Sequence, residues 1–305
     1  MKLVHSSAYQ IDIGPHVWPT AKYDLVRARL LAGALVTSAD FVEPVPASWE
    51  ILALAHTPDY LARVRHVRLS PEEVARLEVP LTPAIADGFR LMTGGTVTAA
   101  RLALDDGLAV HLGGGLHHAF AGHGEGFCLF NDVAVSVREL QRDGRITRAA
   151  IVDCDVHQGN GTAAIFAGDD RVFTFSLHQQ HNYPLVKPPS DLDIGLPDGT
   201  SDGTYLHELE LAMPDVLADE PELIYYLAGA DPYQLDQLGG LRLTMEGLRQ
   251  RDRLVLEAAG AVPLVIVLAG GYARRIEDTV AIHTATVVEA LARSARPGND
   301  PLPGR

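Results

Sequence analysis

Short, nearly continuous apolar runs alternate along the chain with longer stretches in which apolar residues recur every three or four positions. The short runs are typical of strands buried on both faces, and the longer stretches have the period of amphipathic helices. Such strands, separated by helices, predict a mostly parallel sheet covered on both faces. We expect strands at 108–112, 148–152, 171–177, 223–229 and 262–269, and helices near 21–36, 84–104, 131–143, 203–218, 244–260 and 275–293.

No shift of composition or linker divides the chain, so we predict an α/β fold with one three-layer α/β/α domain over residues 1–293. Residues 294–305, which contain several Pro and Gly, are expected to form a flexible C-terminal tail. The segment 181–203 is rich in Pro, Gly and Asp and is typical of a long surface loop, the kind of segment that often lines a site.

Composition and charge narrow the class of protein. Apolar residues make up 47% and charged residues 21%, which fits a folded domain. The formal net charge of -14 argues against direct nucleic-acid binding and would suit a cationic substrate. The alternative is that the negative charge only keeps the protein soluble. Cys128 and Cys154 form no disulfide framework, and we find neither a signal peptide nor an apolar run long enough to span a bilayer. We therefore expect a cytoplasmic protein with no membrane partner.

Each of the five expected strands is followed by polar or glycine-rich sequence. Because ligands of open parallel sheets bind outside the carboxyl ends of the strands, these side chains are expected to gather at one edge. The pattern predicts a site containing His117, His118, Asp153, Asp155, His157, Asn160, Ser176, His178, Asp231 and Tyr272.

The segment DCDVH at 153–157 is the strongest candidate for a metal site. If the strand continues, Asp153, Asp155 and His157 point the same way and would be costly to bury without a cation. Asp and His are usual zinc ligands, and a catalytic zinc needs three protein ligands and an open position. Asp231, at the end of another apolar run, is the best third ligand. The alternatives are a solvated strand end for 153–157 and, for Asp231, a turn residue before Pro232.

Two adjacent histidines fit general acid–base catalysis. His117 and His118 follow three glycines, and each needs an oriented partner, for which Asp153 and Asn160 are available. A charged partner raises the basicity of a histidine more than a neutral one does. The alternative for the pair is two surface imidazoles or a second metal site.

Aromatic residues near the same strand ends provide the remaining candidates. The Tyr272 hydroxyl, after Gly270 and Gly271, is placed to donate to the oxyanion of a tetrahedral intermediate. Phe127 and Tyr183 are candidates for apolar walls around an extended acyl-amine chain. The alternative for Tyr272 alone is an aromatic side chain that caps a loop, and the alternative for Phe127 and Tyr183 is a position in the core.

Six segments together carry a resemblance to a known family. They are LGGGLHHA (112–119), GFC (126–128), DCDVHQGNG (153–161), FSLH (175–178), GADPYQLDQLGGL (229–241) and LAGGY (268–272). With these segments in order over roughly residues 1–293, the chain resembles the zinc-dependent histone deacetylases of the arginase–deacetylase fold group. It is most similar to the class IV branch and to bacterial histone-deacetylase-like amidohydrolases.

The resemblance implies a role for each matching residue. Asp155, His157 and Asp231 would bind one catalytic Zn²⁺. His118, partnered by Asn160, would be the general base, and His117, oriented by Asp153, would be its electrostatic partner. Tyr272 would polarise the scissile carbonyl. Substrate contacts are expected at Gly126, Phe127, Tyr183, Gly270 and Gly271. A K⁺ site would use Asp153, Asp155, His157, Ser176 and Leu177, and a second monovalent cation would use Phe166, Asp169 and Val172.

Asn160 departs from the class I pattern, which has a second aspartate there, so Asn160→Asp is expected to keep activity and shift its pH profile. No acidic residue that would grip a peptide backbone at the rim is identifiable. The expected activity is hydrolysis of an acyl-lysine peptide or protein, or of an acylated small amine. The alternatives are an acetylpolyamine amidohydrolase and a non-catalytic protein that binds acyl-lysine or metal. A two-manganese ureohydrolase is disfavoured because Gly159 stands where that site needs an aspartate. The sequence indicates no oligomeric state.

Overall fold

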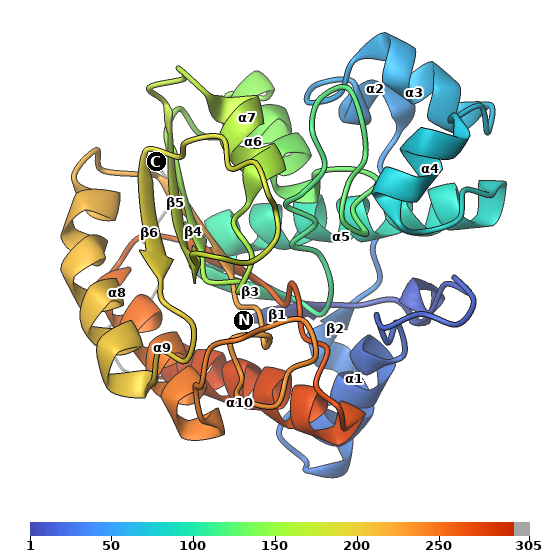
Figure 1. Ribbon diagram of the computed structural model, residues 1–305. Coiled ribbons are helices and arrows are strands. Elements are labelled where there is room, and N and C mark those ends of the chain that lie inside the picture. The colour runs from blue at the N-terminus through green and yellow to red at the C-terminus, as the bar shows by residue number, and fades with distance from the viewer. Residues whose placement is uncertain (296–305) are drawn as a thin grey trace.

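Eight strands within the described residues, 1–295, form one parallel sheet in the computed structural model (Figure 1). Their order across the sheet is β2-β1-β3-β8-β7-β4-β5-β6, and every neighbouring pair is parallel. The strands are β1 Lys2–Val4, β2 Phe41–Val42, β3 Leu108–His111, β4 Ala149–Asp153, β5 Val172–Gln179, β6 Leu192–Leu196, β7 Leu223–Leu227 and β8 Leu264–Val267. The predicted three-layer α/β/α fold is confirmed.

Helices cover both faces of the sheet (Figure 1). On one face lie α5 Pro83–Asp106, α6 Asp132–Arg142 and α7 Asn160–Phe166, with α2 Trp49–Leu52, α3 Pro58–Arg65 and α4 Pro71–Leu77 at their outer side. On the other face lie α1 Lys22–Ala32, α8 Asp202–Leu217, α9 Met245–Ala258 and α10 Ile276–Ser294. The six helices expected from periodicity are all present, with ends that differ by a few residues.

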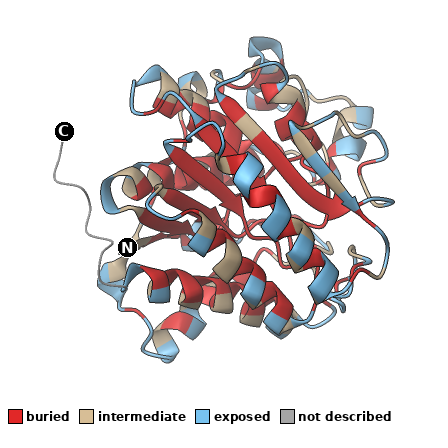
Figure 2. Ribbon diagram, turned by 90° about the vertical axis from the view of Figure 1, so that its left-hand side faces the viewer, coloured by how far each residue is buried: buried red, intermediate tan, exposed pale blue. Residues whose placement is uncertain are grey.

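Side-chain alternation along the central strands builds a separate core on each face. In β7, Tyr225 packs into the core beneath α5 and α6, whereas Ile224 and Tyr226 pack into the core beneath α8 and α9. All three are fully buried, as are most strand residues (Figure 2). Burial of each such side chain contributes about 1.5–3 kcal/mol, which explains why these strands are apolar on both faces.

The expectation of a continuous loop over 181–203 is wrong, because β6 lies within it and pairs with β5 at the sheet edge. The strand alternates between partly buried Leu192 and Ile194 and exposed Asp193 and Gly195, a half-buried edge pattern that the flanking prolines and aspartates obscure. Strands β1 and β2 are three and two residues long, too short for any periodicity to predict. Most of the expected tail, residues 296–305, lies outside the described residues. Within residues 1–295, no helix is both long and apolar enough to cross a membrane.

Candidate active site

One cavity of about 190 Å³ opens beside the carboxyl ends of β3, β4 and β8. It combines apolar and aromatic walls with several titratable groups, the usual character of a binding site for a small molecule or side chain. The lining residues are Trp18, Tyr23, Glu78, Gly114, Gly115, Leu116, His117, His118, Gly126, Phe127, Cys128, Asp155, His157, Asn182, Tyr183, Leu238, Ala269, Gly270 and Tyr272.

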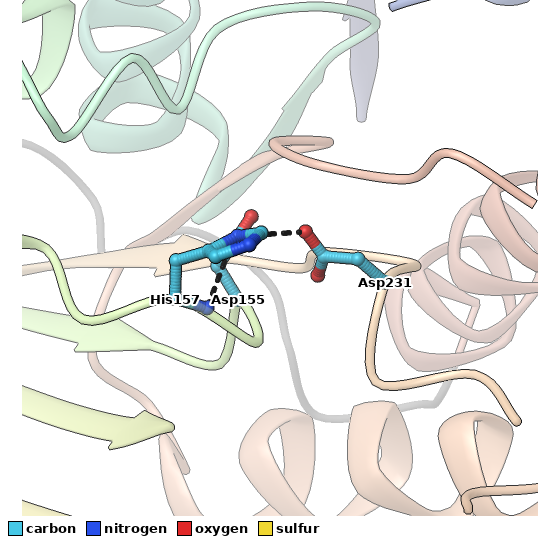
Figure 3. Close-up of side chains that lie close together, drawn as sticks. All are labelled: Asp155, His157 and Asp231. Carbon is cyan, nitrogen blue, oxygen red and sulfur yellow. Dashed lines mark hydrogen bonds and ion pairs between the residues drawn. The ribbon is translucent and has the colours of Figure 1, made fainter. Parts of the chain in front are cut away.

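Asp155, His157 and Asp231 come together at this cavity (Figure 3), with potential ligand atoms all within 4.8 Å of one another. His157 Nδ1 lies 3.0 Å from Asp155 Oδ1 and 3.5 Å from Asp231 Oδ2. The cause of this convergence differs from the expected one, because β4 already ends at Asp153. Local turns replace strand alternation: the Asp155 amide donates to Asp153 Oδ1 at 3.1 Å, and the His157 amide donates to Asp155 Oδ1 at 3.0 Å.

The electrostatics of this cluster fit a divalent cation. Asp231 is fully buried, and its Oδ2 has no hydrogen-bond partner among the described residues. Burial and the neighbouring Asp155 carboxylate raise the pKa of Asp231 to about 7. Two buried carboxylates beside one imidazole are costly without a counter-charge, and one Asp₂His donor set with an open side matches zinc coordination. The donor set therefore fits the ion that the sequence predicts.

His117 and His118 lie in contact, with ring centroids 4.1 Å apart, and each has its expected partner. His117 Nδ1 lies 2.6 Å from Asp153 Oδ2, and His118 Nδ1 lies 2.7 Å from Asn160 Oδ1. Burial lowers the pKa of His117, but the Asp153 carboxylate outweighs it and raises the pKa to about 9. Burial and the neighbouring imidazoles hold the pKa of His118 well below its usual value. The pair thus combines a protonated and a neutral imidazole at pH 7.

Asp132, which the sequence reasoning missed, holds the glycine loop that carries the two histidines. Its carboxylate accepts hydrogen bonds from the Gly115 amide at 3.0 Å and the Leu116 amide at 2.7 Å. Gly115 has a φ of 79°, and a Cβ at this position would collide with Ala269, so glycine is required. The sequence signal that could have found this contact is an acidic residue directly before the mostly apolar stretch 133–137 of the helix.

Tyr272 reaches the cavity from the loop after β8. Its amide donates to Asp236 Oδ2 at 2.6 Å, and its ring packs edge-on against Phe127, with centroids 5.9 Å apart. The Gly270 amide, two residues earlier, donates to Asp155 Oδ2 at 2.9 Å, so the loop that carries Tyr272 is hydrogen-bonded to a carboxylate of the candidate metal site. Burial raises the pKa of Tyr272 well above its usual value, so the phenol stays protonated and able to donate.

The expected substrate contacts are largely at the cavity. Gly126, Phe127, Tyr183 and Gly270 line it, whereas Gly271 does not: a Cβ there would face Ala230 and Thr279. No site role was assigned from the sequence to the other ten lining residues, Trp18, Tyr23, Glu78, Gly114, Gly115, Leu116, Cys128, Asn182, Leu238 and Ala269. Glu78 is an acidic residue among them. Glu78 is the C-cap of α4 and has a φ of 61°, in the left-handed region where Gly or Asn is usual. A glutamate is not a typical residue at such a helix end, so its place at the cavity is evident only from the structure.

The two expected monovalent cation sites differ in their surroundings. Ser176 and Leu177 lie in β5, whose register places Ser176 opposite Asp153, so the first expected set is contiguous. At the second, Asp169 forms ion pairs with Arg138 and Arg171, which leaves backbone carbonyls as the remaining donors. Neither site has been tested, and both stay predictions.

The fold and this site define a three-layer α/β protein with a buried candidate metal-ligand cluster and paired histidines. Comparison with known proteins gives the family. Residues 16–288 match the family described as the histone deacetylase domain, and the chain belongs to that family. Members with deacetylase activity are hydrolases that act on amides.

Similar proteins extend this result over nearly the whole chain. An uncharacterized protein of Picosynechococcus sp. is 41% identical over 284 residues, covering 92% of this chain and 93% of its own. Histone deacetylase 2 of Arabidopsis thaliana is 31% identical, with 92% of this chain and 78% of its own covered. The crystal structure of a histone deacetylase homologue from Aquifex aeolicus has a TM-score of 0.80 and 26% identity, over 95% of this chain and 84% of its own. Another structure at 25% identity and the same TM-score of 0.80 is a histone deacetylase homologue complexed with SAHA.

Proposed function

We propose that the protein is a zinc-dependent amidohydrolase that removes acyl groups, acetyl or longer, from lysine side chains or related amines. One observation carries this proposal: two candidate metal ligands, a neutral histidine and a protonated tyrosine border the same cavity. These are Asp155, His157, His118 and Tyr272. Membership of the histone deacetylase family supports an acylated amine as the substrate.

Asp155, His157 and Asp231 would hold the zinc ion. When bound, zinc supplies Lewis acidity, which polarises the acyl carbonyl and lowers the pKa of a water molecule. A potassium ion held by Asp153, Asp155, His157, Ser176 and Leu177, in part through backbone carbonyls, belongs to the same proposal. The buried cluster of carboxylates at the end of β4 supports both assignments.

His118 acts as the general base. Because Nδ1–H donates to Asn160 Oδ1, the lone pair is on Nε2, where it accepts a proton from the attacking water. Protonated His117, held by Asp153 at 2.6 Å, places a positive charge beside the developing oxyanion. A proton then passes from the histidine pair to the leaving amine, which departs as the carbon–nitrogen bond breaks.

Tyr272 donates its phenolic hydrogen to the acyl oxygen as negative charge develops there. Preorganised donors of this kind contribute most when the site excludes water. The packing of Tyr272 on Phe127 and the hydrogen bond from its amide to Asp236 support a fixed ring orientation. Phe127 and Tyr183 line the cavity and are suited to contact the apolar part of an acyl-amine chain.

A substrate panel on protein of known metal content tests the proposal. Zinc-loaded enzyme is assayed on acetyl-, octanoyl- and myristoyl-lysine peptides, with Tyr272→Phe as the control for contaminating activity. Hydrolysis of at least one substrate, lost on zinc removal and in the variant, is expected. Failure of zinc-loaded protein on every acyl-amine would favour the non-catalytic alternative.

An acetylpolyamine is the second candidate substrate, because Glu78 places a carboxylate at the cavity. Such a group attracts a free ammonium, and the net charge of -14 has the same sign. Adding N-acetylated polyamines to the panel, with a Glu78→Gln variant, decides between the candidates. A KM increase in this variant for the polyamines alone would favour the polyamine activity.

A further inference from the structure

Glu125 is a charged residue beside the histidine pair to which none of the roles above is assigned. Its side chain is only 17% exposed. Oε1 accepts hydrogen bonds from Asn160 Nδ2 at 2.7 Å and from the Tyr183 hydroxyl at 3.0 Å. Oε2 lies 3.3 Å from His123 Nε2. The carboxylate thus joins the partner of His118 to a wall of the cavity.

A neutral asparagine is an ambiguous partner for a histidine, because its amide can present either an acceptor or a donor. With Oδ1 toward His118, the imidazole carries hydrogen on Nδ1 and has its lone pair on Nε2. With Nδ2 toward His118, the opposite tautomer is favoured, and Nε2 can no longer accept a proton. Asn160 is 1% exposed, so bulk water does not select between the two orientations.

We propose that Glu125 is a positioning residue that fixes the orientation of the Asn160 amide and, through it, the tautomer of His118. A carboxylate only accepts hydrogen bonds, so Nδ2 must face Glu125 and Oδ1 must face His118. The inference rests on the proposed function of His118 as the general base. An aspartate at position 160 would need no such partner, because both of its oxygens accept.

Two features keep Glu125 in this role. The Glu125 amide donates to the Cys128 carbonyl at 3.1 Å, and the Cys128 amide donates to the Glu125 carbonyl at 2.9 Å. These two hydrogen bonds fix the position of the backbone from which the Glu125 side chain extends. Burial disfavours its ionised form, but the hydrogen bonds from His123, Asn160 and Tyr183 outweigh this and lower its pKa. The side chain therefore remains a pure acceptor at neutral pH.

The first test is direct observation of the tautomer. Zinc-loaded protein with ¹⁵N-labelled histidine is examined by NMR, and the His118 ring signals are assigned with a His118→Gln variant. We expect hydrogen on Nδ1 in the unsubstituted protein and a shift toward the Nε2–H tautomer in Glu125→Ala. An Nδ1–H tautomer unchanged in Glu125→Ala would overturn the proposal. Because this readout needs no turnover, it remains decisive even if no acyl-amine is cleaved.

The second test is kinetic and uses the conservative variant. Glu125→Ala is expected to lower kcat by about 10- to 100-fold, the usual effect of losing a group that orients an active-site residue. Glu125→Gln keeps the size of the side chain and one acceptor oxygen, but its amide can also donate. It should therefore fix the Asn160 amide only in part, and its kcat is expected to lie between those of Glu125→Ala and the unsubstituted enzyme. Tyr183→Phe removes only the hydrogen bond from the cavity wall, so it measures that contribution separately, through KM.

A double-mutant cycle separates positioning from a general structural role. In an Asn160→Asp background, the amide no longer needs orienting and two carboxylates face each other, so Glu125→Ala should cost no activity or should increase it. A loss of equal size in both backgrounds, at equal melting temperature, would show that Glu125 serves only the fold and would refute the proposal.

Discussion

Lys22 at the start of α1 provides a quantitative test of the electrostatics beside the cavity. The residue is fully buried, and Nζ donates to the Ala269 carbonyl at 2.8 Å. The ammonium also lies 5.3 Å from the ring centroid of Tyr23 and 5.5 Å from that of Tyr272. Burial lowers the pKa of Lys22 to about 8, and the carboxylates of the metal cluster only partly oppose the effect. A charged lysine at pH 7 therefore destabilises the folded state.

The shift from 10.5 to about 8 corresponds to about 3 kcal/mol, at about 1.4 kcal/mol per pKa unit. Lys22→Met retains an unbranched chain and removes this cost. It also leaves the Ala269 carbonyl without its donor, which costs about 1–3 kcal/mol. Metal-free Lys22→Met is thus expected to be about 1 kcal/mol more stable than the unsubstituted protein at pH 7.

Urea unfolding of chelator-treated protein at a series of pH values measures the difference. Between pH 8 and 10.5 the unfolded chain still holds the lysine proton and the folded protein has lost it, so stability attributable to Lys22 rises with pH. The advantage of the variant should therefore shrink and reverse by pH 10. Metal-free protein is required because a bound cation would lower the lysine pKa further.

Lys2→Met is the matched control, since Lys2 also donates to a backbone carbonyl, that of Ala39 at 2.9 Å, but from an exposed position. Its unfolding free energy should change by less than about 0.5 kcal/mol at every pH. The reasoning is refuted if Lys22→Met is destabilised by more than 1 kcal/mol at pH 7 and its difference from the unsubstituted protein is independent of pH.

Three further predictions concern other parts of the molecule. Gly270→Ala is expected to abolish metal binding, because a Cβ there would overlap the carboxylates of Asp231 and Asp155, two of the proposed metal ligands. Gly203→Ala is the control, since a Cβ at that position has nothing within 4 Å, and it should bind metal normally. Metal content after gel filtration is the measurement. Tyr272→Phe should reduce kcat by about 100-fold or more while KM changes little, and an unchanged kcat would remove the tyrosine from the mechanism. Burial lowers the pKa of His56 to about 4 and that of His111 to about 3, so below pH 6.5 the unfolded state binds more protons and stability falls as the pH falls. Each histidine contributes up to about 1.4 kcal/mol per pH unit, and a urea midpoint that is equal at pH 7 and pH 5 would contradict this.

The sheet could be predicted wherever its strands are buried on both faces. Runs such as 223–229 and 262–269 are apolar because each side of the strand packs into a different core. A continuous apolar run of this kind can be recognised in a single sequence. The edges of the sheet were not predictable in the same way. Strand β6 buries only part of one face. Strand β1 pairs with β3 and β2 pairs with β1, and it is this pairing rather than their composition that makes them strands.

The site shows the same division between local and tertiary information. The ends of β4, β7 and β8 indicated Asp155, Asp231 and Tyr272, because the direction of parallel strands determines where those residues gather. Glu78 and Glu125 gave no such signal. Glu78 depends on a left-handed residue at the end of α4, and Glu125 depends on a contact with Asn160, 35 positions away.

The burial of Asp231 has a consequence for the exchange of metal with solution. Asp155 and His157 line the cavity, but Asp231 is fully buried behind them and does not. An ion held by these three residues would therefore meet solution through this cavity, the same one that we propose to admit the acyl group. Any molecule that fills the cavity should slow both loading and loss of the ion without touching a ligand. Chelator-induced inactivation would then be slowest when substrate is saturating, so turnover itself would protect the metal content of the enzyme.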